Sequence, residues 1–237
     1  MDAFGAELIG RLLIFLVTLL LAISAHEAAH AWMSSKYGDD TARMLGRVTL
    51  NPISHTDPIG TLLIPIVGFI FGAMGGALAS IPLIGWGKPT PVNPRNWTNY
   101  KQANVMVSIA GMLANLLIAL IAFTIAKILM ATGTLTIYDV LAINNELGAT
   151  PSPIGILLNM MLFLNVSLAI FNLLPFPPLD GSKVLSTFLP ASWQPVMDML
   201  EQYGFMILLL LMYMGFIGAI MYPVRVIVRN LLIFGSY

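Results

Sequence analysis

Three ionisable side chains interrupt the apolar stretch near the start of this chain. His26, Glu27 and His30 form the pattern H-E-x-x-H within SAHEAAHAW, residues 24–32. On a helix, residues four apart lie on one face, so both imidazoles can reach the same metal ion. Glu27 lies beside the first imidazole, where its carboxylate can act as general base on a metal-bound water. The pattern predicts a zinc hydrolase centre, and an interfacial polar cluster at a helix end is the alternative.

The composition indicates a membrane protein and limits the metal ligands. The 237 residues are 58% hydrophobic and 9% charged, whereas a soluble domain carries about 25% charged residues. Cysteine is absent, so disulfides and thiolate ligands are excluded and any metal must be held by His, Asp or Glu. Eleven basic and eleven acidic residues cancel, and no basic tract suggests nucleic acid as a partner.

Apolar segments of spanning length predict an all-α polytopic membrane protein. A span needs about 20 mostly apolar residues, and five candidates occur at residues 8–34, 61–84, 103–131, 155–176 and 203–222. We expect one membrane-embedded metalloprotease domain over residues 1–237, with five to six transmembrane helices and a broken helix that carries the third metal ligand. The first segment could instead be a secretory signal, but Asp2 and Glu7 argue against a basic leader. Five spans would place residues 85–102 on the side of the N-terminus. The basic residues then divide five against five, and the positive-inside rule gives no orientation.

A catalytic zinc usually has three protein ligands, and the third is not close in sequence. Lys36 and Met33 exclude the extended H-E-x-x-H-x-x-G-x-x-H pattern, so the third ligand is distant, an Asp, or His55. Asp180 is the best candidate because it follows an apolar segment that three prolines break, in FNLLPFPPLDGSKVL. Irregular backbone at membrane depth is tolerated where it lines a cavity, and Gly181 would permit a sharp turn there. The alternative for Asp180 is the N-cap of a following helix.

Taken together, HEAAH and NLLPFPPLDG resemble the site-2 protease family of intramembrane zinc metalloproteases. Two further stretches, LNPISHTDPIGT (50–61) and SIAGMLANLLIA (108–119), are similar to segments of that family and occur in the same order. The similarity covers most of residues 20–190, in a minimal form without a PDZ or CBS domain. Met112 and Ser182 depart from the family pattern. Neither is an expected metal ligand.

The resemblance implies one Zn²⁺ per chain, held by His26, His30 and Asp180, with Glu27 as the catalytic base. It also places Asn172 near the active site, as a substrate or oxyanion contact. The implied activity is hydrolysis of peptide bonds within or near transmembrane helices of membrane-protein substrates, that is, regulated intramembrane proteolysis. The partners would be these substrates and the lipid bilayer of a bacterial or archaeal cell membrane, where this multi-pass protein would lie. The oligomeric state is not indicated.

Several polar residues leave alternatives open. Asn172 could bond the scissile peptide or simply another helix, and the helix contact is favoured for Asn115 and Asn165. His55 and Asp57 are weaker ligand candidates within ordinary loop chemistry. Residues 85–94, GWGKPTPVNP, are expected to form a loop or a re-entrant hairpin that could bind unwound substrate by strand addition. The rival functions are a metal transporter and a non-catalytic scaffold.

Overall fold

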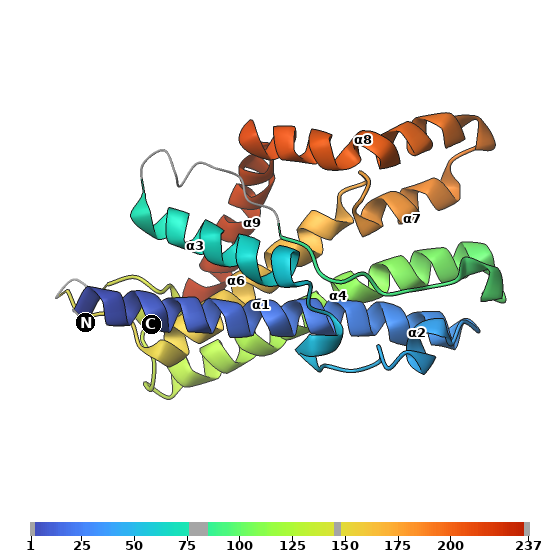
Figure 1. The fold of residues 1–237 in the computed structure, drawn as a ribbon. Helices are drawn as coiled ribbons and strands as arrows, with labels where there is room; N and C mark the ends of the chain where they lie inside the picture. The colour runs from blue at the N-terminus through green and yellow to red at the C-terminus, as the bar shows by residue number, and fades with distance from the viewer. Residues whose placement is uncertain (1–2, 76–84, 145–147, 235–237) are drawn as a thin grey trace.

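A computed structural model describes residues 3–75, 85–144 and 148–234 as a bundle of long helices (Figure 1). No strand occurs within these ranges, and the predicted all-α polytopic class is confirmed. The longer helices are α1 (Ala3–Lys36), α3 (Ile64–Met74), α4 (Tyr100–Ala131), α6 (Pro153–Leu173), α7 (Asp180–Phe188), α8 (Gln194–Tyr213) and α9 (Phe216–Ile233). The short elements are α2 (Thr41–Met44), η1 (Pro52–Ser54), η2 (Pro58–Leu63), η4 (Pro94–Asn96), α5 (Ile137–Val140) and η5 (Ala191–Trp193).

Within the described residues, five helical segments are long and apolar enough to cross a membrane, by length and composition. They are Gly5–Lys36, Tyr100–Ala131, Pro153–Leu173, Ala191–Tyr213 and Phe216–Ile233. The expected span at 61–84 is not among them, because the described apolar helix there is the shorter Pro58–Met74. Its 17 residues would cover about 26 Å of a core roughly 30 Å thick. Gly75, with φ 70°, follows the end of α3. Residues 76–84 lie outside the described part of the chain.

The expected span at 203–222 is also different, because two helices share it. Helix α8 ends at Tyr213 and α9 begins at Phe216. Gly215 between them has φ 78°, a left-handed conformation that glycine adopts without a steric penalty. The chain therefore turns in the middle of this apolar run, and α9 runs crosswise to α1 and α4 in Figure 1.

Helices α1, α4 and α6 pack together and form the centre of the bundle. Small side chains allow their backbones to approach closely, and Ala22, Ala110 and Ala169 are almost completely buried. Large apolar side chains point outward instead, among them Val17 and Leu117, which are 60% and 57% exposed. An outward apolar surface suits helices that face lipid, so the protein is a multi-pass membrane protein.

The expected placement of residues 85–102 beside the N-terminus is wrong. In Figure 1, α1 runs away from the N-terminus and α4 begins at the far end of α1. Hydrogen bonds confirm this, because the Asn93 amide and the Asn96 side chain both donate to Asp39, just beyond α1. The chain before α3 and the chain after residue 84 lie side by side, because the Lys88 amide donates to the His55 carbonyl at 2.8 Å. The segments that meet at this end contain seven of the eleven basic residues, which replaces the expected even division: Lys36, Arg43, Arg47, Lys88, Arg95, Lys101 and Lys183.

Asp39 fastens the loop to the end of α1. Its side chain is fully buried and accepts hydrogen bonds from the Ser34 hydroxyl at 3.0 Å and the Asn93 amide at 2.7 Å. Burial acts to raise the pKa of Asp39, but hydrogen bonds from Thr41, Asn93 and Asn96 outweigh it and lower the pKa to about 2. The carboxylate is therefore charged at neutral pH and holds residues 93–96 in place. This attachment lies next to the loop at residues 85–92.

Candidate metal centre

The two motif histidines and Asp180 meet between α1 and the start of α7. Nε2 of His26 and Nε2 of His30 each lie 3.1 Å from Oδ2 of Asp180. The two Nε2 atoms are 3.0 Å apart. Among the described residues, these three form the group whose ligand atoms could hold one metal ion. The structure thus brings together residues that are separated by about 150 positions in the chain.

The hydrogen bonds behind the imidazoles show which ring nitrogens face the centre. Nδ1 of His26 lies 2.7 Å from Oδ1 of Asn115, and Nδ1 of His30 lies 2.7 Å from the carbonyl oxygen of Val107. Both partners are oxygen acceptors, so both Nδ1 atoms carry a hydrogen, and in the neutral imidazoles that bind metals both Nε2 atoms then present a lone pair. Two lone pairs and one carboxylate oxygen then face each other without a hydrogen between them. Such a donor set is stable when it surrounds a cation.

The spacing of the three atoms fits zinc. Zinc forms bonds of about 2.0–2.2 Å to imidazole nitrogen and carboxylate oxygen and is usually tetrahedral. A tetrahedron with such bonds has edges of about 3.3 Å between ligand atoms. The observed separations of 3.0 to 3.1 Å are close to this value. Three protein ligands leave the fourth position for water or substrate, as in catalytic rather than structural zinc sites.

Asp180 is positioned by the interruption between α6 and α7. Helix α6 ends at Leu173, and Asp180 is the first residue of α7. The N-cap of α7 is Leu179 and no side chain caps this helix, so the structure does not support the capping alternative. Lys183 instead binds the second oxygen, Oδ1, at 2.9 Å. The carboxylate is thereby held with Oδ2 toward the imidazoles.

Gly181 contributes close packing rather than the sharp turn that we expected. It lies in the first turn of α7 and does not have a positive φ. A Cβ atom at this position would lie 2.3 Å from the carbonyl oxygen of Leu173. The absence of a side chain therefore lets the start of α7 fold back against the end of α6.

The Glu27 carboxylate is held by the loop at residues 85–93. The backbone amide of Thr90 donates to Oε2 of Glu27 at 2.8 Å, and the Thr90 hydroxyl donates to the Glu27 carbonyl at 3.0 Å. Thr90 stands between Pro89 and Pro91, neither of which has a backbone N–H. Residues 85–93 form a loop, as expected, and this loop brings one backbone donor to the carboxylate.

The other candidate residues have structural contacts. His55 is fully buried, and its Nε2 lies 2.9 Å from the Thr49 carbonyl, away from the metal-binding group. Asp57 caps η2 by accepting hydrogen bonds from two backbone amides. Asn172 lies in the last turn of α6, where its Nδ2 donates to the Leu168 carbonyl at 3.0 Å. Asn172 also lines the cavity that contains the metal-binding group, whereas His55 and Asp57 do not.

This cavity has a volume of about 1060 Å³ and joins polar and apolar walls. Its polar lining includes Glu27, Asp180 and Asn172. The remainder is largely apolar and comes from α1, α3, α6, α8 and α9, with Phe15, Phe69, Phe171, Phe205, Leu208 and Met212 among the lining residues. A hydrolytic centre that opens into such a cavity can receive an apolar segment of chain.

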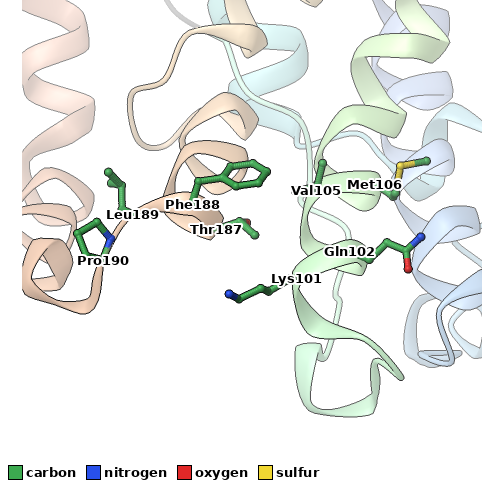
Figure 2. Close-up of a pocket in the computed structure, with 8 residues that line it drawn as sticks. All are labelled: Lys101, Gln102, Val105, Met106, Thr187, Phe188, Leu189 and Pro190. Atoms are coloured by element: carbon green, nitrogen blue, oxygen red, sulfur yellow. The ribbon is translucent and has the colours of Figure 1, made fainter.

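A second hollow of about 700 Å³ lies between the start of α4 and the end of α7. Figure 2 shows Lys101 and Gln102 on one wall and Phe188 and Pro190 on the other. Its lining contains no His, Asp or Glu. It therefore lacks the side chains that could hold a catalytic zinc, which the larger cavity contains.

A zinc-binding group inside a multi-pass helical protein defines a membrane-embedded metallohydrolase. The chain matches the model of "Peptidase family M50" over residues 14–215 and belongs to this family, which confirms the resemblance noted from the motifs. It is 37% identical over 195 residues to "Putative zinc metalloprotease YwhC" of Bacillus subtilis, covering 82% of this chain and 78% of that protein. It is 26% identical over 204 residues to "Putative zinc metalloprotease Rip2" of Mycolicibacterium smegmatis, covering 86% and 68%. No solved structure matches it. The protein is a zinc metalloendopeptidase of the membrane.

The sequence did not predict the residues that orient the two imidazoles and the Glu27 carboxylate. The Val107 contact uses a backbone carbonyl, and the Thr90 contact uses a backbone amide. Neither contact can therefore be predicted from the type of side chain. Asn115 was interpreted as a helix–helix contact, but it also touches the His26 imidazole. A signal for it existed, because a buried amide inside a membrane helix requires a polar partner.

Proposed function

We propose that this protein hydrolyses peptide bonds within or near transmembrane helices of other membrane proteins. His26, His30 and Asp180 would bind the zinc ion, and Glu27 would be the catalytic base. The observation that carries the proposal is the convergence of three potential metal-ligand atoms in a largely apolar cavity that Glu27 also lines. A peptide segment held there would lie beside both the ligands and the base.

When bound, zinc supplies Lewis-acid chemistry that activates water and polarises the scissile carbonyl. Glu27 takes a proton from the attacking water as the new C–O bond forms. It then delivers that proton to the amide nitrogen as the C–N bond breaks, giving a carboxylate and an amine. The Thr90 amide binds Oε2 of Glu27, so the carboxylate keeps one orientation and Oε1 is left for proton transfer.

The substrate must be locally unwound before cleavage. A helical peptide bond is shielded by its own hydrogen bonds and by neighbouring side chains, so helix-breaking residues in a substrate would favour cleavage. Asn172 is suited to binding the exposed peptide. One Nδ2 hydrogen is bonded to the Leu168 carbonyl, and the second can donate to a carbonyl oxygen of the unwound strand. We propose this role for Asn172.

The experiment that tests the proposal separates zinc binding from proteolysis. Purified wild type, Glu27→Gln and Asp180→Ala are compared for zinc content per chain and for cleavage of a transmembrane substrate carrying a central glycine. We expect about one zinc per chain in wild type and in Glu27→Gln, loss of cleavage in Glu27→Gln, and loss of both in Asp180→Ala. Retained turnover in Glu27→Gln would refute the base, and full zinc in Asp180→Ala would refute the third ligand.

A further inference from the structure

Two buried asparagines connect the backbone of α6 to the imidazole of His26. Nδ2 of Asn165 donates to the Met161 carbonyl at 2.8 Å. Oδ1 of Asn165 accepts from Nδ2 of Asn115 at 2.9 Å. Oδ1 of Asn115 then faces Nδ1 of His26 at 2.7 Å. Both asparagines are fully buried, so water does not replace any of these bonds.

The direction of this chain of hydrogen bonds is set at its far end. A backbone carbonyl only accepts, so Met161 requires the amide nitrogen of Asn165 and turns its oxygen toward Asn115. Asn115 must therefore present its nitrogen to Asn165, and the same nitrogen also donates to the Ala22 carbonyl at 3.1 Å. Its oxygen is left facing His26. Only the tautomer with hydrogen on Nδ1 satisfies that contact.

We propose that Asn115 and Asn165 are positioning residues that set the tautomer of His26 and thereby strengthen zinc binding. With hydrogen on Nδ1, the lone pair of Nε2 points toward Asp180, where the ion would bind. Asn165 touches neither the imidazole nor Asp180 and acts through Asn115. The inference rests on the ligand set in the proposed function and adds two residues to it.

The second imidazole provides an internal comparison. Nδ1 of His30 donates directly to the backbone carbonyl of Val107, an acceptor that a side-chain substitution does not remove. The orientation of His26 depends on side chains, whereas that of His30 depends on the backbone of α4. Substitution of the two asparagines therefore perturbs one ligand and leaves the contact of the other in place.

Asn159 is the matched control. It also lies in α6, and its Nδ2 donates to the Val140 carbonyl at 2.8 Å, so it too ties α6 to another element through an amide. It has no bond to Asn165 or Asn115 among the described contacts. If the asparagines act only as generic contacts between helices, replacing Asn159 should have the same effect on zinc as replacing Asn165.

The experiment uses the full chain in detergent with Asn115→Leu, Asn165→Leu and Asn159→Leu. Zinc affinity is measured by competition with a chelator, and the absorption spectrum of the cobalt-loaded protein reports the geometry of the ligands. We expect Asn115→Leu to weaken zinc binding by about 10- to 100-fold. Asn165→Leu should weaken it by about threefold, because Asn115 keeps the Ala22 carbonyl as an acceptor. Asn159→Leu should match wild type in both measurements.

The possible outcomes are distinguishable. Wild-type affinity and an unchanged cobalt spectrum in Asn115→Leu and Asn165→Leu would overturn the proposal, as would an equal loss in Asn159→Leu. Thermal unfolding of the metal-free proteins shows whether each variant folds. If Asn115→Leu does not, the difference between Asn165→Leu and Asn159→Leu decides. Wild type that binds zinc without cleaving would contradict the proposed protease and leave the role of the asparagines standing, whereas wild type without zinc affinity would contradict both.

Discussion

Substitution of Gly111 by alanine should eliminate high-affinity zinc binding, because this glycine lets α4 lie against both imidazoles. A Cβ atom at position 111 would be 2.6 Å from Cε1 of His26 and 2.6 Å from Nε2 of His30. Ordinary contacts of a Cβ begin at 3.4 Å. Each imidazole, or the α4 backbone, must therefore move by about 0.8 Å, whereas a metal site tolerates roughly 0.2 Å in its bond lengths.

Either movement disturbs the centre. Displaced imidazoles cannot keep their nitrogen atoms at bonding distance from one ion, and a displaced α4 carries Val107 and Asn115 away from Nδ1 of the two rings. Changes to such supporting contacts alone typically reduce metal affinity about 10- to 100-fold. Since Gly111→Ala affects both ligands at once, we expect a loss of at least about 100-fold.

The assay is zinc affinity by chelator competition, together with the zinc-dependent rise of the unfolding temperature. Gly10→Ala is the control, because it makes the same change in α1 at a position where a Cβ meets no atom within 4 Å. Wild type and Gly10→Ala should bind zinc and gain thermal stability from it, and Gly111→Ala should not. Equal zinc affinity in all three proteins would show that the packing of α4 against the imidazoles is not as tight as these distances require.

Two further predictions concern the end of the bundle that holds the loop. The lowered pKa of Asp39, about 2 against an ordinary 3.8, means that its stabilisation is fully present above about pH 4 and is lost as the pH falls through 2. Wild type should exceed Asp39→Asn by about 2 kcal/mol in free energy of unfolding at pH 7, with the difference vanishing only below pH 2, and a difference independent of pH would contradict this. From the seven basic residues of these segments, the positive-inside rule predicts that the same end faces the cytoplasm. The chain has no cysteine of its own, so a single introduced cysteine reports its own position. A membrane-impermeant maleimide should therefore label Thr134→Cys but not Met44→Cys in intact cells. Labelling of Met44→Cys alone would show the opposite topology.

The residue pattern was sufficient to predict the chemistry of the first two ligands. The four-residue spacing of His26 and His30 places both imidazoles on one face of any helix, whatever surrounds it. The apolar composition required a membrane, and the prolines before Asp180 required a break in a helix at membrane depth. These conclusions depend on local geometry and on solvent, so they could be drawn before any tertiary contact was known.

Tertiary structure alone decided how far each apolar run extends and what lies behind the imidazoles. The segment at 61–84 is as apolar as a span, but α3 ends before Gly75, and the Asn93 amide binds Asp39 at the end of α1 where the sequence did not predict it. The contacts of Val107 and Thr90 use backbone atoms, which every residue type possesses. Whether such atoms contact an imidazole or a carboxylate depends on how the helices pack. Helix packing results from many weak contacts along the whole chain, which a short motif does not specify.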